Sequence, residues 1–315
     1  MPGKIIRPFN LIIPALVCLA VWTPPRSEAG RYKDHNLLII SVTNFGAQHM
    51  GLYGYGRATT PNLDNWAADA LIFEDAFTQA SWTLPAAASL FTGLYPNTHK
   101  VLERDRNNTL ARDIRTMPEL LGAAGYRTAA FTGGLDQMKQ AGHMRGFATA
   151  ADNPPFTGFA ATTAQAADWL AKNSGGKFFL FVHGYDAHPP FVPSTRFGGV
   201  FASTEGKHVM VDPSFTYRGY MEPGSKEMTA YYHIPGPGPA KGKKAPPRGK
   251  AVLKPDDIAY LRDLYDEKLL DADLQVGNFL NSLEKELLDR TIVIVLSEHG
   301  EMFAEHGRFG RGGAH

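Results

Sequence analysis

Four polar clusters contain the side chains of this sequence that could do chemistry. Three follow short apolar runs, and one opens a helix-like segment. Their hydroxyl, imidazole, amide and carboxylate groups are those that act as nucleophiles, proton carriers and metal ligands in hydrolytic sites. Each cluster by itself also fits an ordinary polar turn after a strand. In chain order, the clusters are residues 43–44 with 48–49, 81–93, 183–190 and 297–301.

Thr83 is the candidate nucleophile. Pro85 and the alanines after it predict a helix that begins near Thr83. Backbone N–H groups and the helix dipole favour an anion at such an end. A hydroxyl placed there could attack a phosphoryl or sulfuryl centre if a metal lowered its pKa. The alternative is that Thr83 only caps the helix.

The third and fourth clusters supply candidate ligands. His183, Asp186 and His188 lie within six residues and are potential metal ligands or anion donors. Glu298 and His299 could both reach a divalent cation at the carboxyl end of a strand. We also expect His183, Asp186 and Arg311, which follows the fourth cluster, to bind substrate.

The elements that must position these clusters indicate an α/β fold. Residues 37–42, 178–182 and 291–296 read as strands buried on both faces, and residues 126–132 as a further strand. A capping-box pattern opens a helix over 116–125, and apolar residues recur at helical spacing over 258–287. Strands alternating with helices predict a doubly wound, mainly parallel sheet flanked by helices, with ligands at the strands' carboxyl ends.

Composition and charge exclude several classes of protein. The chain has 315 residues, is 43% hydrophobic and 20% charged, and carries a formal net charge of +1. These values are typical of a globular protein, and no global charge steers it toward nucleic acid or an anionic membrane. We therefore expect no nucleic-acid partner, and any recognition of anions must be local.

Residues 1–29 have the pattern of a signal peptide. Lys4 and Arg7 precede an apolar run over 11–22, and Ser27-x-Ala29 resembles a cleavage site. A membrane anchor is the alternative, but the run is shorter than the roughly 20 residues that a spanning helix needs. We expect export to the periplasm or outside the cell. The single cysteine, Cys18, lies in this segment, so the mature chain has no disulfide.

Residues 234–250 are rich in Pro, Gly and Lys. This composition predicts a solvated loop without regular structure. The alternative is that this segment is a basic arm with a role in recognition.

Together, the motifs resemble the sulfatase family, within the alkaline-phosphatase-like hydrolases. The resemblance covers residues 36 to 311, and the motifs stand in the family's order. They are Ile40-Ser41-Val42-Thr43-Asn44, His49, Tyr53-Gly54-Tyr55, Thr59-Thr60-Pro61-Asn62-Leu63-Asp64, Thr92-Gly93-Leu94-Tyr95-Pro96 with His99, Gly125-Tyr126-Arg127-Thr128, Tyr185-Asp186-x-His188 and Ser297-Glu298-His299-Gly300-Glu301.

The resemblance implies hydrolysis of sulfate or phosphate-type esters, on small molecules or glycans, by a nucleophile bound to a divalent metal. It implies Thr83 as the nucleophile and His188 as an anion-binding catalytic residue. The metal is expected to be Ca²⁺, with Mg²⁺, Mn²⁺ or Zn²⁺ as alternatives. The metal positions that it implies are Thr43, Asn44, Glu298 and His299.

The chain departs from the family pattern at several of these positions. Thr43 and Glu298 stand where the family has metal-binding aspartates, so one hard anionic ligand becomes a neutral hydroxyl. Thr83 stands where sulfatases have Cys or Ser, and its branched Cβ excludes oxidation to formylglycine. The pattern's arginine is Ala87. Family members also continue beyond the last motif, which predicts that the C-terminal part is missing here. A degenerate member that binds an anion without turnover is therefore the alternative function.

Overall fold

The computed structural model describes residues 32–103, 108–135, 141–233 and 248–311. It divides into two units, Met1–Asp34 and His35–His315, and everything below concerns the second. The predicted signal peptide lies outside the described residues. In the ranges just given, no helix has both the length and the apolar character that crossing a membrane requires.

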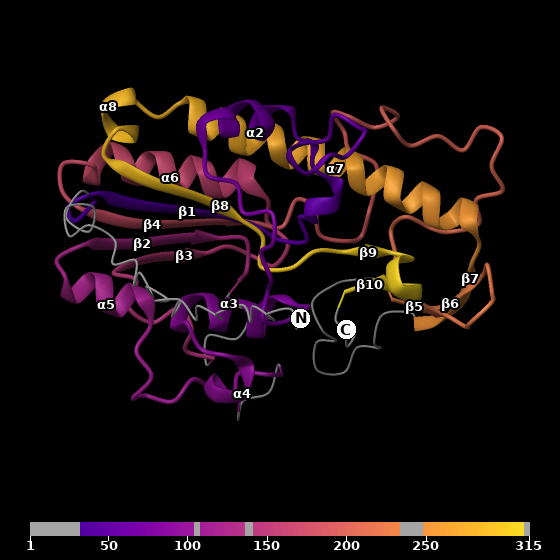
Figure 1. Ribbon diagram of the computed structural model, residues 1–315, viewed down its shortest axis with the longest axis horizontal. Helices are drawn as coiled ribbons and strands as arrows, with labels where there is room; N and C mark the ends of the chain where they lie inside the picture. Colours follow the sequence, from indigo (N-terminus) through magenta and orange to yellow (C-terminus); the bar gives the residue numbers. More distant parts are fainter. Residues whose placement is uncertain (1–31, 104–107, 136–140, 234–247, 312–315) are drawn as a thin grey trace, which may run out of the picture. The chain divides into compact units, whose positions relative to one another are not determined.

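A five-stranded parallel sheet forms the centre of the large unit (Figure 1). Every neighbouring pair is parallel, so all five carboxyl ends lie at one edge. In spatial order, the strands are β3 (Thr149–Asp152), β2 (Arg127–Thr132), β4 (Phe178–Gly184), β1 (Asn36–Val42) and β8 (Thr291–Leu296).

Helices cover both faces of this sheet, as Figure 1 shows, with α3 and α5 on one side and α2, α6 and α7 on the other. The predicted doubly wound, mainly parallel fold is therefore confirmed. The helices are α2 (Pro61–Trp66), α3 (Thr83–Thr92), α4 (Pro96–His99), α5 (Met117–Ala123), α6 (Phe159–Asn173), α7 (Pro255–Asn281) and α8 (Lys285–Leu288). Short 3-10 turns are η1 (Ala47–His49), η2 (Gly51–Tyr53), η3 (Ala67–Asp69) and η4 (Glu305–Gly307).

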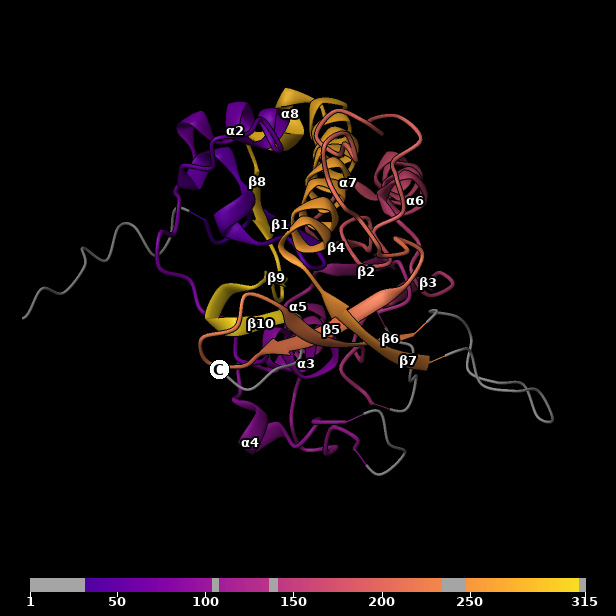
Figure 2. The ribbon, with the colours of Figure 1, turned by 90° about the vertical axis from the view of Figure 1, so that its right-hand side faces the viewer.

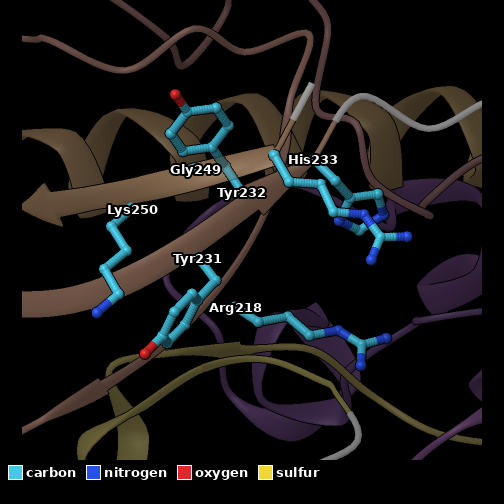
Figure 3. Close-up of a pocket in the computed structure, with 7 residues that line it drawn as sticks. Arg218, Tyr231, Tyr232, His233, Gly249 and Lys250 are labelled. Atoms are coloured by element: carbon cyan, nitrogen blue, oxygen red, sulfur yellow. The ribbon is translucent and has the colours of Figure 1, made fainter. Parts of the chain in front are cut away.

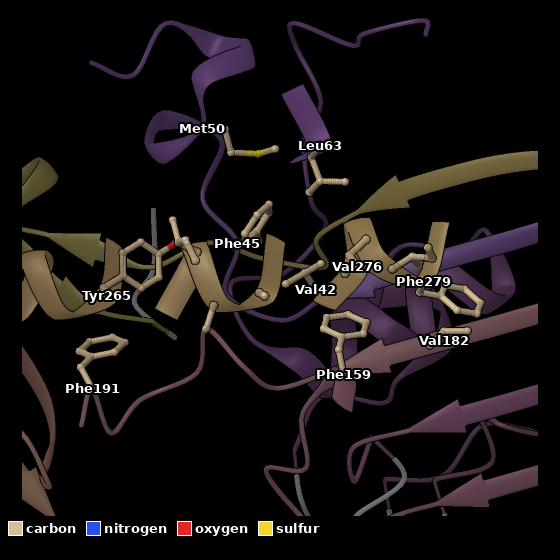
Figure 4. Close-up of a cluster of buried hydrophobic side chains, with 14 of the residues drawn as sticks. Val42, Phe45, Met50, Leu63, Phe159, Val182, Phe191, Tyr265, Val276 and Phe279 are labelled. Carbon is tan, nitrogen blue, oxygen red and sulfur yellow. The ribbon is translucent and has the colours of Figure 1, made fainter. Parts of the chain in front are cut away.

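The central strand β4 shows why an apolar run becomes a buried strand here. All seven of its residues are buried. Alternate side chains enter different clusters: Phe179 and Phe181 pack with Phe91 of α3, whereas Val182 packs on the side of α6 and α7. Figure 4 shows Val182 in the same hydrophobic cluster as Val276 of α7.

The periodic segment 258–287 does not form a single helix. The helix α7 ends at Asn281, and Glu284 is extended (φ −62°, ψ 143°) before the separate turn of α8 begins. Leu283 and Leu287 nevertheless pack against the main core. The apolar spacing continues across the break because both segments face the same core.

A second, antiparallel sheet was not foreseen from the sequence. Its strands, in spatial order, are β7 (Arg248–Leu253), β6 (Met228–His233), β5 (Thr216–Met221), β10 (Arg308–Gly310) and β9 (Met302–Phe303) (Figure 2). Residues 248–250 were expected to lie in an irregular loop and instead begin β7. Pairing with β6 stabilises their extended backbone. The composition of a segment does not predict such pairing, because it depends on a strand elsewhere in the chain. Residues 234–247 lie outside the described part of the chain.

The strand β8 is less buried than the sequence indicates. Among the strands in the described part of the chain, it lies at the edge of the parallel sheet and pairs with β1 alone. Ile292 and Ile294 are each 38% exposed. An apolar run predicts a strand but not its place in the sheet, because an edge strand has only one neighbour to cover it.

Packing in the centre of the parallel sheet is expected to dominate stability. Phe179 is fully buried, whereas Phe77 is 84% exposed. Phe179→Ala should lower the free energy of unfolding by about 3–5 kcal/mol because it leaves a cavity. The matched change Phe77→Ala should alter it by less than about 0.5 kcal/mol. Urea unfolding measures both, and equal losses would contradict this account of the core.

Candidate active site

The carboxyl ends of three neighbouring strands bring the first, third and fourth polar clusters together. Thr43 directly follows β1, His183 is the penultimate residue of β4, and Glu298 lies two residues beyond β8. The register places Ser41 beside both His183 and Leu296. The sheet therefore gathers residues that are more than 100 positions apart in the sequence.

A chain of hydrogen bonds joins these strand ends. The N–H of Gly133 donates to His183 Nδ1 at 3.4 Å, so Nε2 of this ring carries the proton in the neutral form. That Nε2–H donates to Thr43 Oγ1 at 2.6 Å, and the Thr43 hydroxyl donates to Glu298 Oε1 at 2.5 Å. Ser41 Oγ donates to the other carboxylate oxygen at 2.9 Å.

Glu298 is held as a carboxylate despite its burial. Burial alone would raise its pKa, but the neighbouring His183, followed by His299 and Thr43, lowers the pKa to about 2. A buried anion is tolerated only where donors surround it. Glu298 is therefore a fixed negative charge at the carboxyl end of the sheet.

Thr83 faces His299. Its Oγ1 lies 3.0 Å from Nε2, and Nδ1 of the same ring lies 3.0 Å from the carbonyl oxygen of Gly300. A carbonyl can only accept, so Nδ1 carries the proton and Nε2 accepts from the Thr83 hydroxyl. Burial lowers the pKa of His299, which favours this neutral form. The pair has the geometry of a nucleophile beside its base.

Thr83 also lies at the helix end predicted for it. It is the first residue of α3, it is 5% exposed, and the preceding Trp82 is the extended cap residue. Thr83 is not the N-cap residue of α3, because Trp82 occupies that position. Its hydroxyl is used by His299 instead.

Asn44 presents an unpaired oxygen. It has a left-handed backbone (φ 65°), and its backbone oxygen accepts from Tyr265 Oη at 2.6 Å. Its Nδ2 donates to Glu301, whereas its buried Oδ1 has no hydrogen-bond partner. Such an oxygen is costly to bury and is suited to a cation.

Glu301 is a site residue that the sequence reasoning did not select. Besides Asn44, it contacts Arg311, whose Nη1 lies 3.8 Å from Oε2. Burial raises the pKa of Glu301 to about 7, against the opposing effects of Arg311, Arg218 and Asn44. The position of Glu301, two residues after His299, was the only sequence feature that could have pointed to it. The contact with Asn44 follows from the fold, which brings the loop after β8 next to Asn44.

Asp186 and His188 of the third cluster make other contacts than the Thr83–His299 pair. The carboxylate of Asp186 accepts from the N–H of Phe159 at 2.8 Å and so caps α6. We therefore leave Asp186 out of the candidate site. His188 is buried and packs on Tyr185, which in turn packs on His183 with ring centroids 4.7 Å apart.

The donors present fit a divalent cation. Among the side chains that the structure describes, no three of His, Cys, Asp or Glu are arranged to hold a metal. A cation bound here would need neutral oxygens as well. The unpaired Oδ1 of Asn44, the hydroxyl of Thr43 and the carboxylate of Glu298 are hard donors of the type that Ca²⁺ and Mg²⁺ prefer. His299 was also predicted as a ligand, but the single lone pair of its Nε2 faces Thr83.

Comparison with known proteins identifies the family. The family model described as Sulfatase matches residues 35–315. The chain belongs to the sulfatase family. A curated relative, the N-acetylglucosamine-6-O-sulfatase of Bacteroides thetaiotaomicron, is 24% identical in an alignment that covers 96% of this chain and 64% of that protein. This member of the family thus spans less than two thirds of that relative.

Solved structures agree on the fold of this sulfatase-family chain. The phosphonate monoester hydrolase of Agrobacterium radiobacter matches with a TM-score of 0.63 at 17% identity, covering 89% of this chain and 66% of that one. The C-terminal periplasmic domain of EcEptC from Escherichia coli, in complex with Zn, matches with a TM-score of 0.56 at 16% identity, covering 88% and 68%. Sulfatase-like enzymes in general depend on a metal.

The raised pKa of Glu301 predicts a pH-dependent stability. Because its folded pKa of about 7 exceeds the ordinary 4.5, the protein loses stability as pH rises through this window. Glu301→Gln removes the titration. The free energy of unfolding of the variant, relative to that of the wild type, should therefore rise by up to about 3 kcal/mol between pH 4.5 and pH 8.

Urea unfolding in EDTA at both pH values measures this gain. Glu286→Gln, an exposed change on α8, is the control and should show none. A stability difference between Glu301→Gln and wild type that stays the same at both pH values would contradict the prediction.

Proposed function

We propose that the chain is a hydrolase of sulfate or phosphate-type esters in which Thr83 is the nucleophile and His299 is its base. The observation that carries the proposal is the 3.0 Å contact between Thr83 Oγ1 and His299 Nε2. It is supported by the hydrogen bond from His299 Nδ1 to Gly300, which leaves Nε2 as the acceptor.

The proposed reaction has two steps. In the first, Thr83 Oγ bonds to sulfur or phosphorus, its proton passes to His299 Nε2, and the bond to the leaving alcohol's oxygen breaks as that oxygen takes a proton from solvent water. In the second, water attacks the sulfur or phosphorus, the bond to Thr83 Oγ breaks, and His299 returns its proton to Thr83 Oγ. Sulfate or phosphate leaves, and the proton lost by the attacking water passes to solvent. The N–H groups at the start of α3 favour the anionic centre during both steps.

Three residues would hold the metal in this proposal: Glu298, Asn44 and Thr43. A divalent cation bound there would lower the pKa of the attacking hydroxyl and offset the charge of the ester oxygens. Ca²⁺ suits these oxygens, and Mg²⁺, Mn²⁺ or Zn²⁺ are the alternatives. No formylglycine is involved, since the Cβ of threonine is branched.

Two further residues are proposed to bind the anion. The first is His188, whose ring packs on Tyr185, and Tyr185 also packs on His183. The second is Arg311, which contacts Glu301, the hydrogen-bond partner of Asn44. His183 orients Thr43 and sits beside Glu298, with Nε2 to Oε1 at 3.6 Å.

The proposed substrates are small-molecule or glycan esters outside the cytoplasm. The glycan class is supported by the relative named N-acetylglucosamine-6-O-sulfatase. Export is supported by the signal-peptide pattern of residues 1–29.

Removing the Thr83 hydroxyl should abolish turnover. Thr83→Ala is expected to lower kcat at least about 10³-fold on nitrophenyl sulfate or nitrophenyl phosphate, whereas Thr83→Ser keeps a hydroxyl and measurable turnover. The control is Thr92→Ala in the last turn of the same helix, where the hydroxyl donates to the backbone oxygen of Ala88 and accepts from the N–H of Leu94. Turnover that survives in Thr83→Ala, or a folded wild type that hydrolyses neither ester with metal present, would sink the threonine mechanism.

Removing the charge of Glu298 should weaken metal binding. We expect Glu298→Gln to raise the dissociation constant for Ca²⁺ or Mg²⁺ about 100-fold, as measured by titration calorimetry. Asn44→Gly should also weaken binding while tolerating the backbone at φ 65°. Glu286→Gln is the surface control. Metal affinities equal to the wild type in both site variants would show that the metal lies elsewhere.

A further inference from the structure

A cationic pocket of about 570 Å³ lies on the antiparallel sheet (Figure 3). Its basic lining residues come from three strands: Arg218 from β5, His233 from β6, and Arg248 and Lys250 from β7. The half-exposed ring of Tyr231 lies among them. The candidate active site uses none of these residues directly.

Strand register explains why the basic groups face the same way. Tyr231 lies opposite Arg218 on one side and Lys250 on the other. His233, two residues further along β6, lies opposite Arg248. Opposed residues, and residues two apart on one strand, share a face of a sheet. The fold therefore presents four basic side chains and one tyrosine on a single face.

These basic groups are concentrated on one face. Within the ranges that the structure describes, Arg218, Arg248 and Lys250 form no ion pair with a carboxylate. Lys250 instead lies over the ring of Tyr231, 5.4 Å from its centroid. Because the whole chain has a net charge of only +1, this gathering of like charge is local and is suited to an anionic ligand.

A short series of residue contacts leads from the pocket toward the candidate active site. The strand β10 pairs with β5, with Phe309 opposite Gly219, so Gly310 lies against Arg218. A Cβ on Gly310 would lie 3.2 Å from Cγ of Arg218. Arg311 follows directly, and its guanidinium is 3.8 Å from Glu301, the partner of Asn44. Arg218 and Arg311 thus form a basic path from the pocket to the site.

We propose that this pocket is a second anion subsite, which binds a further sulfate or carboxylate group of an anionic glycan whose scissile ester lies at Thr83. This proposal rests on the proposed function. The exposed ring of Tyr231 offers an apolar surface to the face of a sugar, and Arg218, Arg248 and Lys250 offer donors to the anion. The small net charge does not suit a nucleic acid, which requires an extended basic surface.

Binding is tested in the Thr83→Ala background, so that the result does not depend on turnover. Calorimetry with a heparin-derived tetrasaccharide at 150 mM salt compares this protein with the same protein carrying Arg248→Gln and Lys250→Gln. The dissociation constant is expected to rise about tenfold. Arg218→Gln is an independent single variant with an expected rise in the same direction.

A matched control removes two exposed charges elsewhere, Lys172→Gln on α6 and Lys285→Gln on α8. Unchanged affinity in the control, together with weaker binding in the pocket variants, supports the subsite. Equal losses in control and pocket variants, or no loss in either, would overturn it. A 12-nucleotide single-stranded DNA that binds as tightly as the tetrasaccharide, and weakens equally in the pocket variants, would overturn the glycan assignment.

Discussion

The arrangement of the site depends on the hydroxyl of Thr43, which lies between His183 and Glu298. One small neutral group thereby connects the carboxyl ends of β1, β4 and β8. The chain of donors that ends on Glu298 has a fixed direction, because Gly133 donates to the far nitrogen of His183. A buried network of this kind is stable only when every member has its partner. The site is therefore ordered by hydrogen bonds within the protein itself.

Two buried glutamates respond to this environment in opposite ways. Glu298 accepts from two hydroxyls and lies near two histidines, so its charged form is favoured. Glu301 has weaker compensation, since Arg311 remains at 3.8 Å, and burial favours its neutral form. Both lie within a few residues of His299, and neither behaviour can be read from the order of residues alone. Number and distance of donors decide the charge of each carboxyl group.

The two sheets contribute different chemistry. The parallel sheet supplies buried, directional groups: a hydroxyl, a neutral imidazole and an unpaired amide oxygen. The antiparallel sheet supplies exposed positive charge on one face. Reactive groups need dry, fixed surroundings, whereas recognition of a flexible anionic ligand needs accessible donors. The chain passes from β8 of the parallel sheet to β9 and β10 of the antiparallel sheet, and Arg311 directly follows β10.

The sequence by itself determined the fold class and the family, and it predicted which polar clusters lie at the carboxyl ends of the strands. Apolar runs at residues 37–42 and 178–182 identified buried strands, and polar residues after them identified the reactive edge of the sheet. Proline and alanine near Thr83 located the helix end. These features are local, so spacing and residue type report them.

Only the tertiary structure decided the contacts made over long distances in the chain. It placed His299 within hydrogen-bond distance of Thr83, brought Glu301 to Asn44, and used Asp186 to cap α6. It also paired residues 248–250 into a strand and left β8 at an edge. Strand pairing and side-chain partners depend on segments that are far apart in sequence, and no local pattern encodes which of them will meet.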